Sequence, residues 1–156
     1  MADDFLSQIR AFRDRAVANM DTVVQEATAG IAAALVERTP VDTTALRANW
    51  QFTVGVEGSE ADYSLRDLSP GGSDTANAMG AQIRSVPAGY KGYITNCLDY
   101  MPHIEYGLYT NIHGNKRNSG KTVNGFSTQA PSGVILITAI EWVESFVNPA
   151  IAKLKI

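Results

Sequence analysis

The chain has 156 residues, 45% hydrophobic and 19% charged, a composition typical of one ordinary soluble domain and unlike that of a disordered segment. The net charge of -3 and the pI of about 5.3 argue against an open nucleic-acid-binding surface, which usually carries a basic excess. No apolar run is long enough to span a bilayer, and the acidic N-terminus is unlike a signal peptide, so we expect a cytoplasmic protein without membrane contact. The single cysteine, Cys97, excludes an internal disulfide bond and a Cys-rich metal site.

Residues 3–38 are predicted to form one long amphipathic helix. Apolar residues recur there at steps of three or four, with charged residues between them: Phe5, Ile9, Phe12, Ala16, Met20, Val23, Val24, Ala27, Ile31 and Leu35. An unbroken helix of this kind would be about 50 Å long at about 1.5 Å per residue. That exceeds what a domain of this size needs to cover its core, so the surplus should project or pack on a neighbour. Gly30 leaves open a bend, or two shorter helices that fold back on each other.

The helix is expected to end near residue 38, because Pro40 has no N-H group and disfavours helical geometry at the residue before it. Apolar and polar residues then alternate from Trp50 onward, which predicts a half-buried strand over residues 49–57. Asp42 and Thr43 are expected to cap a short helical turn between these two elements. One interpretation of this stretch is a simple helix stop.

The other interpretation treats residues 39–50, here called the hinge, as part of a family signature, which is described below. Its structural residues would be Pro40, Asp42, Leu46 and Trp50. We expect Leu46 and Trp50 to be buried where the first helix meets the sheet.

Further elements follow in a mixed pattern. A helix is predicted over residues 75–85, a second core strand over 90–98, a short helix over 100–108, and a final helix that starts at Pro131 and is ended or kinked by Pro149. The apolar density of this last helix predicts burial on most sides. Together these elements predict one α+β domain over residues 1–156. A small, mostly antiparallel sheet would pack against the long N-terminal helix and a buried C-terminal helix.

Residues 110–128 form a segment rich in Gly, Asn, Ser and Lys, which predicts a long flexible loop. Lys116, Arg117 and Lys121 are the only cluster of one charge sign in the chain, and Phe126 is the apolar anchor we expect in this segment. Charges without interleaved aromatic residues usually belong to a solvated loop, so a binding role is the alternative interpretation.

None of the candidate catalytic or ligand motifs is complete. Residues 118–122 end like a phosphate-binding Walker loop, but Asn115 stands where the first glycine is required. His103 and Glu105 are two residues apart and so lie on different faces of a helix, and His113 has no second ligand at metalloprotease spacing. Cys97 has no base that the sequence places beside it. We therefore predict no catalytic residue, no cofactor, no metal site and no enzymatic activity.

Three segments, in order, resemble one protein family. Residues 39–47, Thr-Pro-Val-Asp-Thr-Thr-Ala-Leu-Arg, followed by Trp50, resemble the Thr-Pro-Val-Asp-Thr-Gly-x-Leu-Arg signature of small head-tail joining proteins of long-tailed phages, also called neck, tail-completion or minor tail protein Z-like proteins. Residues 93–107 resemble a strand of that family with its Asn, Tyr and Glu-Tyr-Gly positions, and residues 129–133 resemble the start of its last helix. Thr44 stands where the family usually has Gly, which predicts that this turn cannot use a positive backbone φ.

The resemblance implies a structural virion protein of the phage neck. Such proteins form a ring, here expected to be a hexamer, at the head-proximal end of the tail, which they complete and join to the head around the DNA channel. Implied partners are other copies of the chain, the tail tube or terminator protein, and the head-closure or connector protein. The implied location is the virion, after assembly in the host cytoplasm.

In such a ring, Lys116, Arg117, Lys121 and Phe126 would contact the next ring, or the genomic DNA non-specifically. A first alternative is a tail terminator that caps the tail tube. A second is a small nucleic-acid-binding protein, against which the acidic pI argues, and a third is an enzyme.

Overall fold

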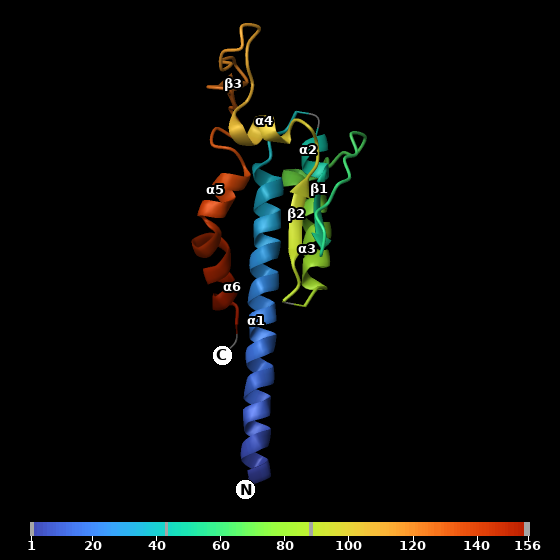
Figure 1. Cartoon of the computed structure of the whole chain (residues 1–156), viewed down its shortest axis with the longest axis vertical. Helices are drawn as coiled ribbons and strands as arrows, with labels where there is room; N and C mark the ends of the chain where they lie inside the picture. Colours follow the sequence, from blue (N-terminus) through green and yellow to red (C-terminus); the bar gives the residue numbers. More distant parts are fainter. Residues whose placement is uncertain (1, 43, 88, 155–156) are drawn as a thin grey trace.

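The computed structural model describes residues 2–42, 44–87 and 89–154. Its axis is α1 (Ala2–Arg38), a straight helix whose N-terminal half projects beyond the rest of the chain (Figure 1). A two-stranded sheet and α3 (Ser73–Arg84) lie on one side of the C-terminal half of α1, and the C-terminal helices lie on the other side. The short helix α4 (Met101–Tyr106) lies across the end of α1, and residues 110–128 project beyond it.

The predicted long helix is confirmed as a single unbroken element. Gly30 does not bend it; instead, it lets the C-terminal segment approach closely. A Cβ atom at Gly30 would lie 3.0 Å from Cδ1 of Phe146. The helix ends at Arg38, two residues before Pro40, as the missing N-H group requires.

The predicted α+β fold is confirmed, although its sheets are very small. Strands β1 (Trp50–Val54) and β2 (Gly92–Asn96) pair antiparallel, with Trp50 opposite Asn96 and Val54 opposite Gly92. A separate hairpin consists of β3 (Thr122–Val123) and β4 (Phe126–Ser127). The remaining short elements are α2 (Ala45–Ala48), directly before β1, and the 3-10 turn η1 (Pro70–Gly72), directly before α3.

The core lies around the C-terminal half of α1. In that half, other elements pack against several sides of the helix, and its own side chains Ala29, Ala32, Leu35 and Val36 are buried. The apolar residues there are therefore not confined to one face, as they are in the N-terminal half. Other elements contribute Leu46, Trp50, Met79, Ile83, Leu98, Met101, Ile104 and Val134. The expected burial of Leu46 and Trp50 is therefore confirmed.

The C-terminal segment differs from the prediction. It is divided into α5 (Ile135–Ile140), a π-helical turn η2 (Val143–Val147) and α6 (Asn148–Ala152), and it begins four residues after Pro131. The expectation that it would be buried on most sides is wrong for the single chain. Val134, Thr138 and Ala150 are buried against the rest of the chain, whereas Leu136, Ile140 and Trp142 are exposed. Apolar density alone does not say how many sides a neighbour covers.

Candidate partner-binding surfaces

The hinge is organised by one buried hydrogen-bond chain at the end of α1. The indole Nε1 of Trp50 donates to Oγ1 of Thr39 at 2.8 Å, and that hydroxyl donates to the carbonyl oxygen of Leu35 at 2.6 Å. Thr39 and Trp50 are both buried, so each polar group needs the partner that it has. The hydroxyl of Thr39 thus joins the last turn of α1 to the first residue of β1.

Arg47 also stabilises the end of α1. Its Nε donates to the carbonyl of Thr39 at 3.1 Å, and its Nη2 donates to the carbonyl of Glu37 at 3.1 Å. The last carbonyls of a helix have no intrahelical donors and lie at the negative end of its dipole, so a guanidinium group suits this position. Thr39, Arg47 and Trp50 therefore occur in this order because they form the hydrogen bonds that stabilise the C-terminal end of α1.

Two expectations about the hinge are wrong. Thr44 has a φ of 63°, in the left-handed region, although its side chain disfavours that conformation. Among the described residues, no side-chain hydrogen bond caps α2, so Asp42 does not act as the expected cap; Thr43 lies outside the described residues. The Oγ1 atom of Thr44 is buried without a hydrogen-bond partner. The chain therefore keeps the geometry that Gly would provide, at an energetic cost.

The projecting segment is attached to the hinge at its base. The side-chain amide of Gln129 accepts from the backbone N of Val41 at 2.9 Å and donates to the Val41 carbonyl at 3.2 Å. Lys121 and Asp42 form an ion pair of 3.4 Å that is highly exposed and therefore weak. Sequence positions 41 and 129 are far apart, and nothing in either segment alone predicts this pairing.

A cleft of about 620 Å³ lies between the hinge and this segment. Its lining combines the hinge residues Pro40, Asp42 and Leu46 with three tyrosines, Tyr63, Tyr100 and Tyr109, and three cations, Arg66, Arg117 and Lys121. Burial raises the pKa of the Tyr100 and Tyr109 hydroxyls, and neighbouring tyrosines at Tyr100 and Asp42 at Tyr109 raise it further. Like ordinary tyrosines, both are protonated donors at neutral pH. The cleft is thus aromatic and cationic, and suits an extended segment that carries carboxylate groups.

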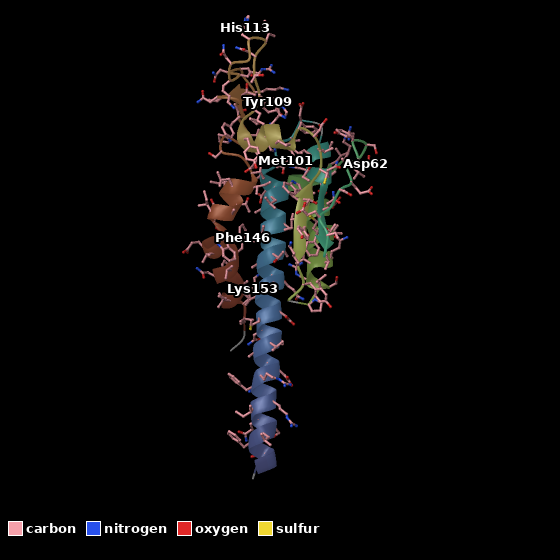
Figure 2. All side chains as sticks on the ribbon, viewed as in Figure 1. Asp62, Met101, Tyr109, His113, Phe146 and Lys153 are labelled. Carbon is pink, nitrogen blue, oxygen red and sulfur yellow. The ribbon has the colours of Figure 1, made fainter. Side chains whose placement is uncertain are left out.

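Residues 110–128 contain more structure than a featureless loop. Asn124 and Gly125 both have positive φ values and connect β3 to β4 as a two-residue turn. The dipeptide Asn-Gly between apolar residues is the signal in the sequence that predicts such a hairpin. Figure 2 shows His113 at the far tip of the segment, with Tyr109 close to α4.

The predicted contact residues are divided between two places. Arg117 and Lys121 line the cleft, whereas the ammonium group of Lys116 donates to the carbonyl of Gly107 and so holds the base of the segment. Phe126 is half-buried and packs over Gly107, where any Cβ would clash with the phenyl ring. Within the chain, Phe126 anchors the hairpin to α4.

Glu105 anchors the C-terminal segment to α4. Its carboxylate accepts from the backbone N atoms of Val134, Ile135 and Leu136 at 2.8, 2.8 and 2.9 Å, and so caps the start of α5. Gly133 has a φ of 78°, and a Cβ there would lie 2.8 Å from the Glu105 carbonyl oxygen. Together these contacts tie α4 to the C-terminal segment.

Asp67 plays the matching role at α3. Its carboxylate accepts from the backbone N atoms of Ser69 and Thr75, both at 2.9 Å. Burial disfavours its charged form, but hydrogen bonds from Ser69 and Thr75 outweigh burial and hold the pKa of Asp67 at about 2. Neighbouring polar groups at the start of a helix therefore keep this buried carboxylate ionised.

The chemical candidates come together in no catalytic arrangement. The Cys97 thiol donates to the carbonyl of Gly58 at 3.0 Å and accepts from the amide of Gln51 at 3.6 Å, and neither group is a general base. The His103 ring lies 5.6 Å from the Tyr109 ring. Across residues 2–42, 44–87 and 89–154, no group of three or more His, Cys, Asp or Glu side chains is placed to hold a metal ion. In the same residues, no helix is both long enough and apolar enough to cross a membrane.

At the opposite end of the molecule, residues 4–22 of α1, here called the free half, present an uncovered apolar stripe. Phe5, Phe12 and Met20 lie along it, with 63%, 66% and 66% of their surfaces exposed. A stripe of this size on a helix that projects into solvent is typical of a protein interface. The chain therefore offers two candidate partner-binding surfaces, the free half and the cleft with its hairpin, at its two ends (Figure 1).

The N-terminal part of the chain is similar to a known protein family. Residues 3–67 match the HK97-gp10-like family, described as "Bacteriophage HK97-gp10, putative tail-component". The matched range contains α1 from Asp3 onward, the hinge and β1, and ends at Asp67. No curated protein and no solved structure matches the chain.

The HK97-gp10-like match confirms the resemblance to a phage tail and neck family. It supports a structural tail component of a bacteriophage, located in the virion and in contact with other proteins of the phage tail or head. It also favours a structural role over an enzymatic one.

Proposed function

We propose that this protein forms a ring in the phage neck, at the head-proximal end of the tail, and joins the completed tail to the head around the DNA channel. Six copies would form the ring. It would be assembled in the host cytoplasm and become part of the virion. The proposed partners are the tail tube or terminator protein on one side and the head-closure or connector protein on the other. The observation that carries the proposal is the HK97-gp10-like match over α1 and the hinge.

The shape of the chain supports a joining role. The free half of α1 and the hairpin, which carry its two candidate binding surfaces, lie at opposite ends of the molecule (Figure 1). A protein that only capped a surface would need one such end. Repeated in a ring, the chains would extend toward the tail at one end and toward the head at the other, and cyclic symmetry makes many weak contacts cooperative.

The cleft and hairpin are proposed to form the contact with the next component. Arg117 and Lys121 would attract an acidic segment of the neighbouring ring or, from the channel side, the phosphates of the DNA. Phe126 and Lys116 would act less directly, by holding the hairpin in place over α4. Pro40, Asp42, Leu46 and Trp50 are proposed as the structural hinge that fixes the direction of this contact.

Removing the chain from the phage by an amber mutation tests this function. We expect DNA-filled heads and tails of normal length that fail to join, and recovery of infectious particles when the purified chain is added. Imaging of the wild-type virion should then place six copies in the neck. Tails of uncontrolled length would instead indicate a terminator, and particles that join normally without the chain would contradict the proposal.

A charge-reversed hairpin tests the proposed contact. Arg117→Glu together with Lys121→Glu should lower the recovery of joined particles at least tenfold, whereas Lys91→Glu, a cation beside Tyr93 on β2, should leave it unchanged. Replacement of Cys97 or His103 by Ala should leave joining intact in folded protein, because we propose no enzymatic role.

A further inference from the structure

The free half of α1 carries a repeat that its anchored half does not need. An apolar line begins in the free half, continues into the anchored half, and runs through Ile9, Phe12, Ala16, Met20, Val23 and Ala27, at steps of three, four, four, three and four residues. Each residue therefore has an apolar equivalent 11 positions away, such as Ile9 and Met20. An 11-residue repeat corresponds to about 3.67 residues per turn, close enough to a straight helix that the line stays on one face with a slight right-handed drift.

The stripe is also wider than the seam of a two-stranded coiled coil. With the flanking Leu6 and Val17, it covers about 140° of the helix circumference, at about 100° per residue. A stripe of this width can contact one neighbour along each edge. Seven large apolar residues of α1, from Phe5 to Val24, are 49% to 66% exposed. Their exposed area is roughly 700 Å², close to the roughly 800 Å² that each partner buries in a standard interface.

The charges of the free half favour a like partner. Residues 4–22 hold three arginines and three aspartates, a net charge of 0, so equivalent helices can lie side by side without strong repulsion. A strongly charged partner such as DNA would find no complementary surface. The stripe also continues a face that is already an interface within the chain, because Ala27 is buried and Ile31 packs on the core.

We infer that the occupant of this stripe is a second copy of the chain, and that the free halves of several copies pack side by side as a parallel, nearly straight helical bundle. Parallel packing follows from cyclic symmetry, which gives every copy the same direction along the axis. The inference deepens the ring of the proposed function and rests on it for that symmetry. The ring would then be held by α1, while the hairpin at the other end stays free for a different partner.

Engineered cysteines can test both contact and direction. In a Cys97→Ser background, Ile9→Cys and Met20→Cys place a thiol on the stripe, and Ser7→Cys and Ala18→Cys place one on the opposite, polar face. The full chain would be oxidised both at high concentration in solution and inside assembled virions. We expect the stripe variants to give at least tenfold more disulfide-linked dimer than the polar-face variants, in one setting or both.

Mixing Ile9→Cys chains with mass-tagged Met20→Cys chains distinguishes the directions. A parallel bundle gives dimers linked between equivalent residues, whereas an antiparallel pair gives mixed dimers between residues 9 and 20. A second pair of variants keeps the test independent of disulfide chemistry. Phe12→Asp should raise the concentration needed for association at least tenfold, and the matched Ala11→Asp should not change it.

Equal crosslinking from both faces, or none in solution and virions, would overturn the inference, as would mixed dimers. Loss of neck incorporation in Phe12→Asp without stripe crosslinks would mean that the stripe binds a different tail protein, which also overturns it. A neck ring without stripe crosslinks would leave the proposed function standing. Stripe crosslinks in a chain that is absent from the neck would contradict the function and retain the bundle.

Discussion

At the scale of single residues, Trp50 makes two separable contributions. Its ring fills the space between α1 and the sheet, and its Nε1 bonds to Thr39 in a site where the Trp50 residue is only 4% exposed. Trp50→Ala should lower the free energy of unfolding by about 3 to 5 kcal/mol, through lost burial and a cavity. Trp50→Phe should cost less, because it keeps part of the ring volume. Urea denaturation measures both, and an unchanged midpoint for Trp50→Ala would show that the ring is not part of the core.

Thr44 should be improved by substitution. Thr44→Gly relieves the strain of the positive φ of 63° and removes the buried hydroxyl that has no partner. It should raise the free energy of unfolding by about 1 kcal/mol. Thr44→Ala removes the hydroxyl and the γ-methyl group but keeps Cβ, so it retains backbone strain at the positive φ and should gain less. The same denaturation assay compares the three chains. A less stable Thr44→Gly chain would mean that the hydroxyl has a partner in solution.

Asp67 should make stability depend on acid pH. Its folded pKa of about 2 lies below its ordinary value of 3.8, so its contribution of about 2 kcal/mol is present above about pH 4 and is lost as the pH falls through about 2. Asp67→Asn should therefore be less stable at pH 7 and approach the parent protein at pH 2. The exposed Asp74→Asn is the control and should change stability by less than about 1 kcal/mol. A pH-independent difference between Asp67→Asn and the parent would contradict the assignment.

At the scale of elements, the hairpin of residues 110–128 depends on Gly125. A Cβ there would lie 2.3 Å from the carbonyl oxygen of Gly107, so Gly125→Ala should separate the hairpin from α4. Trypsin should then cut faster at Lys116, Arg117 and Lys121, whereas Gly114→Ala, where a Cβ meets nothing within 4 Å, should change the rate less. The flexibility expected from the sequence remains a prediction. In the parent chain these sites should be cut in the free subunit and protected in the virion.

Elements with a clear period were predictable from the sequence. The 3.6-residue period up to Arg38, the missing N-H of Pro40 and the alternation after Trp50 are local signals, and each matched the structure. The hinge contacts were not predictable, because Gln129 meets Val41 only after the chain has folded. Likewise, the sequence around Glu105 predicts only a residue of a short helix. Its role as the cap of a helix that begins 30 positions later appears only in the folded chain. The exposure of the C-terminal helices also could not be predicted, because it depends on which other elements pack against them, and a sequence pattern does not give this.

At the scale of the whole molecule, the core and the free half should be separable. Every residue of the core cluster comes from residue 29 or later, so deleting residues 2–20 should leave the thermal unfolding midpoint within a few degrees of that of the parent. The shortened chain should nevertheless fail to enter virions, because its apolar stripe is gone. Deleting residues 111–115 at the opposite tip is the matched control for shortening a projection. A shortened chain that unfolds would show that the free half is part of the fold.

The unbroken course of α1 also makes the molecule a ruler. The helix is about 55 Å long, at about 1.5 Å for each of its 37 residues, and this length sets the distance between the N-terminal end of the free half and the hairpin. An insertion of 11 residues before Gly30 would lengthen this distance by about 16 Å. It would keep the stripe on nearly the same face of the helix, since 11 residues make about three turns. An insertion of two residues would barely change the length and would turn the stripe to the far side. The sequence of α1 therefore encodes a distance and a rotation between neighbouring parts of the particle.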